Sequence, residues 1–525
     1  MKKTMKQHSF TSRLKPLALV FGVALAFASC ANEDVAQNPT NPNDDNDKNL
    51  TTFVAGDETK TRTSLDYNSS DFSWEKDDYI YVKDDDNVLR KSTNAPKSKV
   101  ASFKYKVPGK FTAHTSYKVY YLGKNGGGNS VTISTDQRQT APDNTEHFGT
   151  AGDYGTATAT GTLGGKSFSF ELEHQPGYLV FQPYTSNTIL QNCYLTKVEV
   201  SSDNDIAETY TVNTSTGALT GSAGSKQIVL TTSGSSSNPN GFPLTNSAAN
   251  VTTNGAYMVI KPGTHTLRVR YWVKDVATNV EGTITKTLPA TAYASNTYYD
   301  MTAQLDVKNY EGDKYYMWDA QEQYWKGHEW NLGGSQPTLT TQSASSDYPQ
   351  SSSDLNNRWY NESYPGWGIS IPATHTSCKD LPNVNEMVWY AAKGDPRWDG
   401  DELWTTMGHL HKGGMWFLKQ ANITGFRADQ DHVGRDWRAY GDNGSWPASQ
   451  TLPSAADAGN YFYLPALGYY HSDLLTLVGF YGDYWSSSTT PMGSNRAYYL
   501  DFNISRVGVG PIDRYEGLRV EPTFE

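Results

Sequence analysis

Apolar and polar residues alternate along much of the chain between residues 51 and 307. Alternation with a period of two places every second side chain on the same face of a β-strand. Turn-forming segments, such as Gly126–Gly128 and the Pro-Gly pair at 262–263, separate these runs. Short strands between such turns are typical of β-sandwiches and barrels. The clearest expected strands lie at 79–82, 117–122, 168–172, 194–200 and 267–273.

A proline-glycine turn near residue 175 breaks one strand pattern just before another begins. Residues 174–177 read His-Gln-Pro-Gly, and a new run begins at Tyr178. Proline cannot donate to a strand ladder, and glycine weakens a strand. We therefore expect two β-domains, at residues 51–175 and 176–307.

Residues 358–525 have a mixed pattern. Val384 to Tyr390 carry apolar residues at near-helical spacing, and Pro382 and Asn383 precede them where helices often start. A second helix is expected at 403–407. Strand-like runs follow at 461–469, 484–488, 497–502 and 517–522, so an α+β domain is expected.

Residues 308–357 separate these regions. Tyrosines and tryptophans cluster at 315–330, where they either pack under the last domain or form a connector. Ser, Thr and Gln dominate residues 335–357, which predicts a linker.

The chain starts with the order of an export signal. A basic segment precedes an apolar run at 17–28, which is shorter than the roughly 20 residues of a membrane-spanning helix. The segment 27–30, Phe-Ala-Ser-Cys, resembles the bacterial lipobox. This resemblance implies that residues 1–29 are a lipoprotein signal peptide and that Cys30 is lipidated.

Residues 30–50 are rich in Asn, Asp and Pro and should form a disordered acidic tether. The acidic segment 32–34 resembles the surface-export signal of Bacteroides-type lipoproteins. The expected location is therefore the cell surface, attached to the outer membrane through the lipid.

Charge and cysteine content narrow the choice of partners. The net charge is −11, and loss of the five cations of the signal peptide leaves −16. Such a chain is a poor ligand for nucleic acids and anionic membrane surfaces. Apart from Cys30, only Cys193 and Cys378 remain. We place them in different domains and expect free thiols, because two cysteines do not make a disulfide framework.

Three segments in the first half resemble motifs of the fimbrillin family of Bacteroides-type pilins. The segments 61–82, 172–181 and 257–263 occur in the family's order, and Tyr298 to Met301 resemble the strand that closes the second domain. The resemblance implies two β-sandwich domains and assembly by strand addition, in which a segment from a neighbouring subunit pairs with an open sheet. Other fimbrial subunits are the partners that this implies.

In that family an arginine-specific protease removes an N-terminal strand. Arg62 is the first arginine after the signal, and it follows the strand-like residues 51–55. Arg62 is therefore the candidate processing site. An ordinary exposed arginine at a strand start is an equal alternative.

The last domain resembles the FISUMP family, also called the major paralogous domain, which is related to C-type lectins. The segments that carry the resemblance are Leu-Pro-x-x-x-Glu at 381–386, Leu-Pro-Ala-x-Gly-Tyr at 464–469, Tyr-Trp-Ser-Ser at 484–487 and Gly-Leu-x-Val-x-Pro at 517–522. The expected fold is thus mainly β, with two fimbrillin-like β-sandwich domains followed by a C-type-lectin-like α+β domain.

Signatures of catalysis or metal binding are weak. Residues 161–167 imitate a phosphate-binding loop but lack its first glycine and are expected to form a turn. His409 and His411 have no third ligand at a recognisable spacing, so we expect no metal centre and no cofactor. The acidic segment 399–402 leaves calcium as a minor alternative. We expect a protein that is not an enzyme.

Aromatic and acidic residues in the segments 398–404 and 413–417, expected to be loop-like, form the candidate ligand site. Sugar rings stack on indole faces, and carboxylates accept hydrogen bonds from hydroxyl groups. The candidates are Trp398, Asp399, Asp401, Glu402, Trp404 and Trp416.

These observations favour a fimbrial tip or accessory subunit that presents its last domain as an adhesin. Its ligand would be a glycan or protein on a host or microbial surface. A surface lipoprotein that captures glycans as nutrients and never polymerises is the alternative. An enzyme with carboxylates hidden in the last domain is a third hypothesis.

Overall fold

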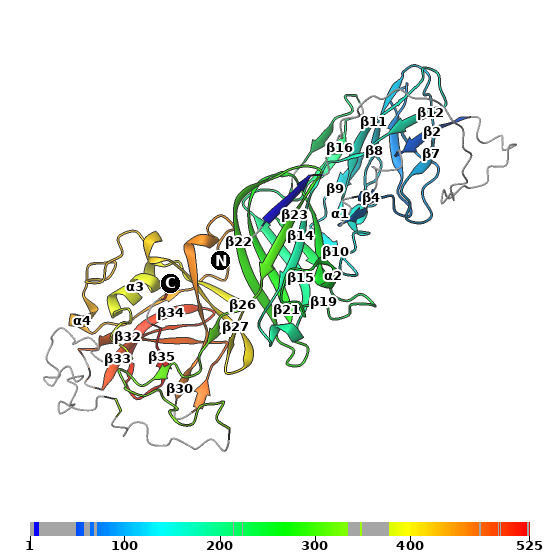
Figure 1. Cartoon of the computed structure of the whole chain (residues 1–525). Helices are drawn as coiled ribbons and strands as arrows, with labels where there is room; N and C mark the ends of the chain where they lie inside the picture. Colours follow the sequence, from blue (N-terminus) through cyan, green and yellow to red (C-terminus); the bar gives the residue numbers. More distant parts are fainter. Residues whose placement is uncertain are drawn as a thin grey trace, which may run out of the picture. The chain divides into compact units, whose positions relative to one another are not determined.

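The computed structural model places most of the chain in β-strands (Figure 1). It describes residues 5–9, 49–56, 64–67, 71–213, 215–222, 224–333, 347–348, 377–471, 474–491, 493, 495–521 and 524–525. Cys30, Arg62 and most of the expected linker at 335–357 lie outside the described residues. The prediction of a mainly β fold is confirmed. The two-sandwich and lectin-like assignments, and the boundaries at 175 and 307, stay predictions.

Contacts divide the chain into two compact units. The first comprises Met1–Tyr184, Leu195–Thr266 and Pro289–Gln304, and the second comprises Thr185–Tyr194, Leu267–Leu288 and Leu305–Glu525. Two long strands, β21 (Gly263–Lys274) and β22 (Glu281–Tyr293), contribute residues to both units.

The first unit consists of short strands with two single-turn helices. Its strands and helices are β1 (Met5–Ser9), β2 (Leu50–Ala55), β3 (Ser64–Asp66), β4 (Asp71–Ser73), β5 (Ile80–Lys83), β6 (Leu89–Lys91), β7 (Phe103–Pro108), β8 (Ser116–Tyr121), β9 (Ser130–Thr132), β10 (Asp136–Arg138), α1 (Phe148–Ala151), β11 (Gly155–Gly161), β12 (Ser167–Phe170), β13 (Glu173–His174), β14 (Gly177–Tyr184), β15 (Tyr194–Ser202), β16 (Thr209–Val212), β17 (Leu219–Gly221), β18 (Gln227–Thr231), β19 (Phe242–Pro243), α2 (Val251–Asn254), β20 (Ala256–Ile260) and β23 (Thr297–Gln304).

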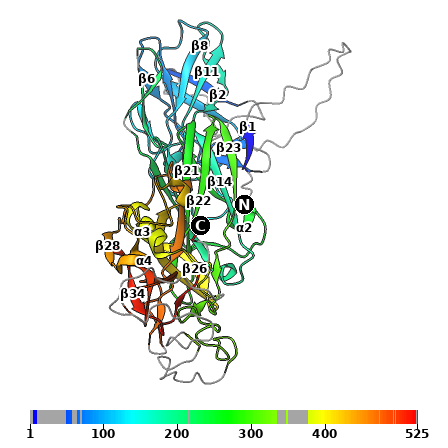
Figure 2. The same cartoon turned by 90° about the vertical axis from the view of Figure 1, so that its left-hand side faces the viewer.

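One large sheet of this unit has the strand order β6-β5-β8-β11-β12-β2-β7, with β13 paired to β11. The segment expected to be a turn joins β11 to β12 as a hairpin, in which Gly161 pairs with Phe168. That expectation is confirmed. Another sheet has the order β1-β23-β14-β20, and Figure 2 shows β1 beside β23.

A buried polar cluster joins two of the segments that resemble fimbrillin motifs. Nδ1 of His174 lies 3.0 Å from Oδ1 of Asp153, and the hydroxyl of Tyr178 donates to the same oxygen at 2.7 Å. The ring of Phe72 stacks on the imidazole of His174 at a centroid distance of 4.2 Å. The first two motifs therefore meet in one core.

The second unit contains one helix of ten residues among its strands. It includes the parts of β21 and β22 that lie within Leu267–Leu288. Its other strands and α-helices are β24 (Asn309–Tyr310), β25 (Tyr315–Tyr316), α3 (Val384–Lys393), β26 (Arg397–Thr406), β27 (His409–Leu418), α4 (Trp437–Tyr440), β28 (Gly444–Pro447), β29 (Tyr461–Pro465), β30 (Tyr469–His471), β31 (Leu474–Thr476), β32 (Gly482–Thr489), β33 (Arg496–Phe502), β34 (Arg506–Asp513) and β35 (Leu518–Arg519).

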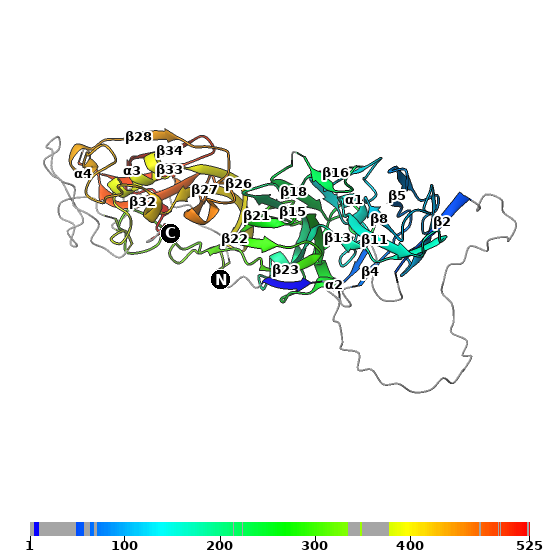
Figure 3. The same ribbon diagram turned by 90° about the horizontal axis from the view of Figure 1, so that it is seen from above.

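Helix α3 confirms the first predicted helix. Asn383 caps it by accepting from the backbone N–H of Glu386, and the Glu386 side chain accepts from the backbone N–H of Asn383. This reciprocal capping box satisfies donors that the first turn leaves unpaired. The apolar face of α3 packs over β32, β33 and β34 (Figure 3).

The segments of the FISUMP-like pattern converge in the second unit. The sheet order is β25-β35-β32-β33-β34-β28. The hydroxyl of Tyr484 donates to the Pro465 carbonyl at 2.6 Å, and Tyr484 pairs with Arg519 of β35. The backbone N–H of Ser487 donates to the Pro382 carbonyl at 3.1 Å. All four segments are thus neighbours in the second unit.

The aromatic cluster at 315–330 packs into the second unit. Tyr315 and Tyr316 pair with β35, and Trp318 is fully buried with its indole donating to the Ser486 carbonyl at 2.9 Å. Tyr315 to Trp318 therefore pack within the second unit, whereas Trp330 at the end of the cluster is 52 % exposed.

Two local expectations are wrong. The second helix, expected at 403–407, is replaced by the end of β26, and the segments around Trp398 and Trp416, expected to be loop-like, form the hairpin of β26 and β27. The burial of Leu403 to Thr406 explains the first error, because four consecutive buried side chains hide the period of a strand. None of the helices that the structure describes has both the length and the apolar character to cross a membrane.

Candidate functional site

The candidate site lies on the β26–β27 hairpin in the second unit. The antiparallel register shifts between Asp399 and Leu403, which indicates a β-bulge. A bulge redirects side chains from the regular alternation. Strand β22 pairs with β26 at Thr283 and Glu402, so a segment more than a hundred residues earlier completes the site.

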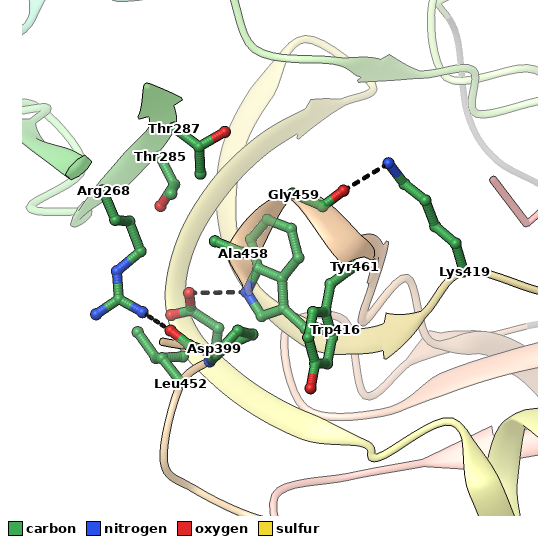
Figure 4. A pocket seen from close by; sticks show the side chains of 11 residues that line it. Arg268, Thr285, Thr287, Asp399, Trp416, Lys419, Leu452, Ala458, Gly459 and Tyr461 are labelled. Atoms are coloured by element: carbon green, nitrogen blue, oxygen red, sulfur yellow. Dashed lines mark hydrogen bonds between the residues drawn. The ribbon is translucent and has the colours of Figure 1, made fainter. Parts of the chain in front are cut away.

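Asp399 is buried at the centre of this arrangement. Its Oδ1 accepts from Nη2 of Arg270 at 2.8 Å and from the backbone N–H of Asp401 at 3.0 Å. Its Oδ2 accepts from the indole Nε1 of Trp416 at 3.1 Å (Figure 4). Three donors therefore share the charge of a carboxylate that is 3 % exposed.

Glu402 lies next to Asp399 and binds β22. Its carboxylate accepts from the Thr285 hydroxyl at 2.6 Å, the Thr285 backbone N–H at 3.0 Å and the Thr283 hydroxyl at 3.1 Å. Burial, followed by the charge of Asp399, raises the pKa of Glu402 to about 7. Glu402 can therefore gain or lose a proton near neutral pH.

A cavity of about 270 Å³ opens over these residues. This volume lies just below the usual range of ~300–1,000 Å³ for ligand pockets, so it suits a small ligand. Figure 4 shows its walls. The lining residues are Arg268, Thr285, Thr287, Asp399, Trp416, Lys419, Leu452, Pro453, Ala458, Gly459 and Tyr461.

Two cations on different walls are held by backbone carbonyls. Nη1 of Arg268 donates to the carbonyl of Pro453, and Nζ of Lys419 donates to that of Gly459 at 2.9 Å. Trp416 lies between these walls (Figure 4). Its ring contacts that of Tyr463 at a centroid distance of 5.0 Å. The cavity thus combines positive charge, hydroxyl groups and aromatic surface.

The six residues proposed from the sequence occupy different environments. Asp399 and Trp416 line the cavity, and Glu402 contacts its wall through Thr285. Asp401 forms an ion pair with Lys412 at 3.2 Å. Trp398 and Trp404 are buried and do not line the cavity. Ligand binding by any of the six stays a prediction.

The histidine pair belongs to the same hairpin. His411 stacks on Trp404 at a centroid distance of 5.0 Å, and the rings of His409 and His411 are 6.4 Å apart. Within the described ranges, no three or more His, Cys, Asp or Glu side chains are grouped so that they could hold a metal ion.

Sequence reasoning missed the contribution of β21 and β22. Leu267, Val269 and Tyr271 were expected in a strand, and their side chains are buried. The alternate positions, Arg268 and Arg270, carry two of the cations of the site. Two arginines on one strand face were a visible signal, but nothing in the chain indicated which hairpin they would meet.

A second candidate functional element is strand β2 in the first unit. It pairs in parallel with β12 and antiparallel with β7, so it has a neighbour on each side. Thr51, Phe53 and Ala55 point into the core, and Phe53 stacks on Phe168. Removal of β2 would expose two strand edges and a row of apolar positions.

The segment after Arg62 is held by a different set of contacts. The hydroxyl of Tyr67 donates to Oδ1 of Asp300 at 2.9 Å, and Nε2 of Gln182 donates to both of these oxygens at 3.0 and 2.9 Å. Burial raises the pKa of Tyr67 to about 12. This hydrogen-bonded triangle attaches Tyr67 to β14 and β23 and not to β2.

Comparisons with known proteins give remote structural matches. No family model matches the chain, and no curated protein matches it significantly. A presumed cell adhesion protein from Bacteroides ovatus is 14 % identical, with 49 % of this chain and 93 % of that chain covered and a TM-score of 0.31. The fimbrial anchor protein of Porphyromonas gingivalis is 12 % identical, with 46 % and 83 % covered and a TM-score of 0.23.

A fimbrial protein from Bacteroides ovatus is matched over a longer span. It is 10 % identical, with 88 % of this chain and 99 % of that chain covered and a TM-score of 0.22. TM-scores this low do not establish a common fold. Family membership therefore rests on the sequence motifs and is a proposal.

Proposed function

We propose that this protein is a cell-surface fimbrial subunit, at the tip or in an accessory position, that presents its second unit as an adhesin. The placement of β2 carries the proposal. A strand that lies between two others and supplies alternate side chains to the core is the part that strand addition would replace. The order of the fimbrillin-like motifs supports the same assignment.

Cleavage at Arg62 would separate β2 from the rest of the first unit. β2 would then be held only by its pairing and packing, whereas Tyr67 would remain attached through Asp300 and Gln182. A strand donated by another subunit could form the same main-chain hydrogen bonds with β7 and β12. Its alternate residues would fill the positions of Phe53 and Ala55.

The second unit supports a terminal position. A shaft subunit must donate a strand to its neighbour, but here more than two hundred residues of the second unit, Leu305–Glu525, follow the last segment of the first unit. This unit has a polar cavity with an aromatic wall, as expected of a binding module. Because Asp399 is held by three donors, we favour binding over catalysis.

N-terminal sequencing of surface protein, with Arg62→Lys as the key variant, tests the processing. The wild type should begin at Thr63, whereas Arg62→Lys should keep its tether and stay out of fimbriae. Arg90→Lys is the matched control, because Arg90 is partly exposed and paired with Asp84. Polymerised subunits with an intact tether would contradict the proposal.

Immunogold labelling of purified fimbriae tests the position. Gold particles are expected at fimbrial ends or at isolated points. Continuous labelling of the shaft would reject a tip or accessory role. An uncut, monomeric lipoprotein on the cell surface would instead support nutrient capture, which the ligand cavity also favours.

A further inference from the structure

The cavity over β26 and β27 is more cationic than a site for neutral sugars requires. Arg268 and Lys419 line it, and Arg270 lies directly behind Asp399. Asp399 is the one carboxylate among the described lining residues. Glu402 also lies behind the wall, against Thr285, so three cations (Arg268, Arg270 and Lys419) face two carboxylates (Asp399 and Glu402). The balance in and behind the walls is therefore positive.

Asp399 is poorly suited to receive ligand hydroxyl groups. Its Oδ1 already accepts from Arg270 and from the backbone N–H of Asp401, and its Oδ2 accepts from the Trp416 indole. Three of the roughly four acceptor positions of this carboxylate are thus occupied, so Asp399 can accept about one hydrogen bond from a ligand. A ligand carboxylate would instead bind the cations of the cavity and would not depend on Asp399.

The remaining groups match an acidic sugar. Ammonium and guanidinium groups form charge-assisted hydrogen bonds with carboxylates. Thr287 offers a hydroxyl group on β22, and the aromatic rings of Trp416 and Tyr461 provide apolar surface for the ring of a sugar. The volume of about 270 Å³ limits the buried part to the size of about one sugar unit.

We infer that this cavity binds the carboxylate-bearing sugar at the end of, or within, a glycan. The inference rests on the proposed adhesin function and specifies its ligand class. Lys419 is the principal contact for the carboxylate, since its ammonium group has three donors and uses one on Gly459. Trp416 supports the sugar ring and is itself oriented by Asp399.

Titration calorimetry with the full chain tests this inference. The probes are methyl β-glucuronide and the α-methyl glycoside of N-acetylneuraminic acid, with methyl β-glucoside as the neutral counterpart. At least one acidic probe should bind roughly tenfold or more tightly than the neutral probe, and added salt should weaken that binding. The two acidic probes distinguish a uronic acid from a sialic acid.

Two variants locate the binding. Lys419→Gln should weaken binding of the acidic probe by about tenfold, and Thr287→Val should weaken it by a few fold. Lys412→Gln is the matched control, because Lys412 lies on β27, which ends directly before Lys419, and pairs with Asp401 outside the cavity. Its affinity should equal that of the wild type.

Other outcomes would overturn the inference. Equal binding of neutral and acidic probes, unchanged affinity in both Lys419→Gln and Thr287→Val, or no binding of either acidic probe each contradicts an acidic-sugar site. These results leave the fimbrial assignment intact, because processing at Arg62 and position in the fimbria are measured separately. Failure of processing would equally leave the sugar measurements valid.

Discussion

Phe53 and Phe168 stack at a centroid distance of 5.4 Å where β2 pairs in parallel with β12. Both rings are buried, and Phe111 and Tyr117 surround Phe53 with edge-on contacts at 5.1 and 6.5 Å. The strand that processing would remove is therefore also a main contributor to the first core. Loss of β2 would uncover the apolar side chains that now contact Phe53, and a donated strand with alternate apolar residues could cover them again.

Phe53→Ala should destabilise the uncut protein by about 3–5 kcal/mol, because a buried ring is replaced by a cavity. Hydrogen exchange of peptides from β2, β7 and β12 measures the effect locally. Val54→Ala is the control, since Val54 lies on the other face of β2 and is half-buried. After cleavage and strand replacement, Phe53→Ala should have no effect. Equal exchange in both uncut variants would contradict the assigned role of β2.

Tyr67→Phe should loosen the segment that follows Arg62. The substitution removes one hydroxyl group from the triangle with Gln182 and Asp300, and the loss of such a hydrogen bond costs about 1 kcal/mol. Limited proteolysis at residues 64–73 should become faster. Tyr79→Phe, a change at another half-buried tyrosine of the first unit, should leave the rate unchanged. A slower or unchanged rate in Tyr67→Phe would mean that the triangle does not hold the segment.

Glu402 should make the stability of the second unit depend on pH. Its pKa of about 7 is raised above the value near 4.3 of an unfolded glutamate, so the folded protein retains a proton that the unfolded chain releases. Stability should therefore fall as the pH rises from about 4.5 to 7. Tryptophan fluorescence reports on this unit, because twelve of the fourteen tryptophans follow residue 308.

Glu402→Gln should flatten this pH dependence, since the amide cannot lose a proton and its oxygen can still accept from Thr285. Glu322→Gln, at an exposed glutamate of the same unit, is the control. If Glu402→Gln kept the wild-type dependence of unfolding free energy on pH, another group would be responsible for that dependence. The raised pKa of Glu402 would then have no role in stability.

Both internal cysteines should be unreactive in the folded protein. Cys193 and Cys378 are free thiols and are 1 % and 0 % exposed. Burial raises the pKa of both thiols, which disfavours the reactive thiolate. Mass spectrometry should show no alkylation at either site before unfolding and two alkylated sites afterwards. A disulfide between them, or rapid labelling in the native state, would contradict this expectation.

The strength of each local signal decides what could be predicted from the sequence. Helix α3 was predictable because Asn383 and Glu386 form a capping box that needs no distant partner. The end of β26 was not, because burial of Leu403 and Trp404 on both faces removes the alternation. Only part of the cavity could be predicted. Trp416 could be proposed from the sequence as an aromatic candidate, but Arg268 and Thr287 reach the cavity because strands that are distant in the sequence pair with each other.

Asp483→Asn should stabilise the second unit at alkaline pH. Asp483 pairs with Asp501 across β32 and β33, and its buried Oδ2 has no hydrogen-bond partner. Burial, followed by the charge of Asp501, raises the pKa of Asp483 well above its usual range. The folded protein therefore loses stability as the pH rises above about 4, where the unfolded aspartate ionises.

An asparagine at position 483 keeps the shape of the side chain, carries no charge and can donate to the carboxylate of Asp501. The expected gain in unfolding free energy is about 1–3 kcal/mol at pH 8 and close to zero at pH 4. Fluorescence-detected urea unfolding at the two pH values measures this difference. Asp313→Asn, at an exposed aspartate, is the control and should leave the unfolding free energy unchanged at both pH values. A loss of stability at pH 8 would show that the Asp483 carboxyl group is required in its ionised form, because only that state is unavailable to asparagine.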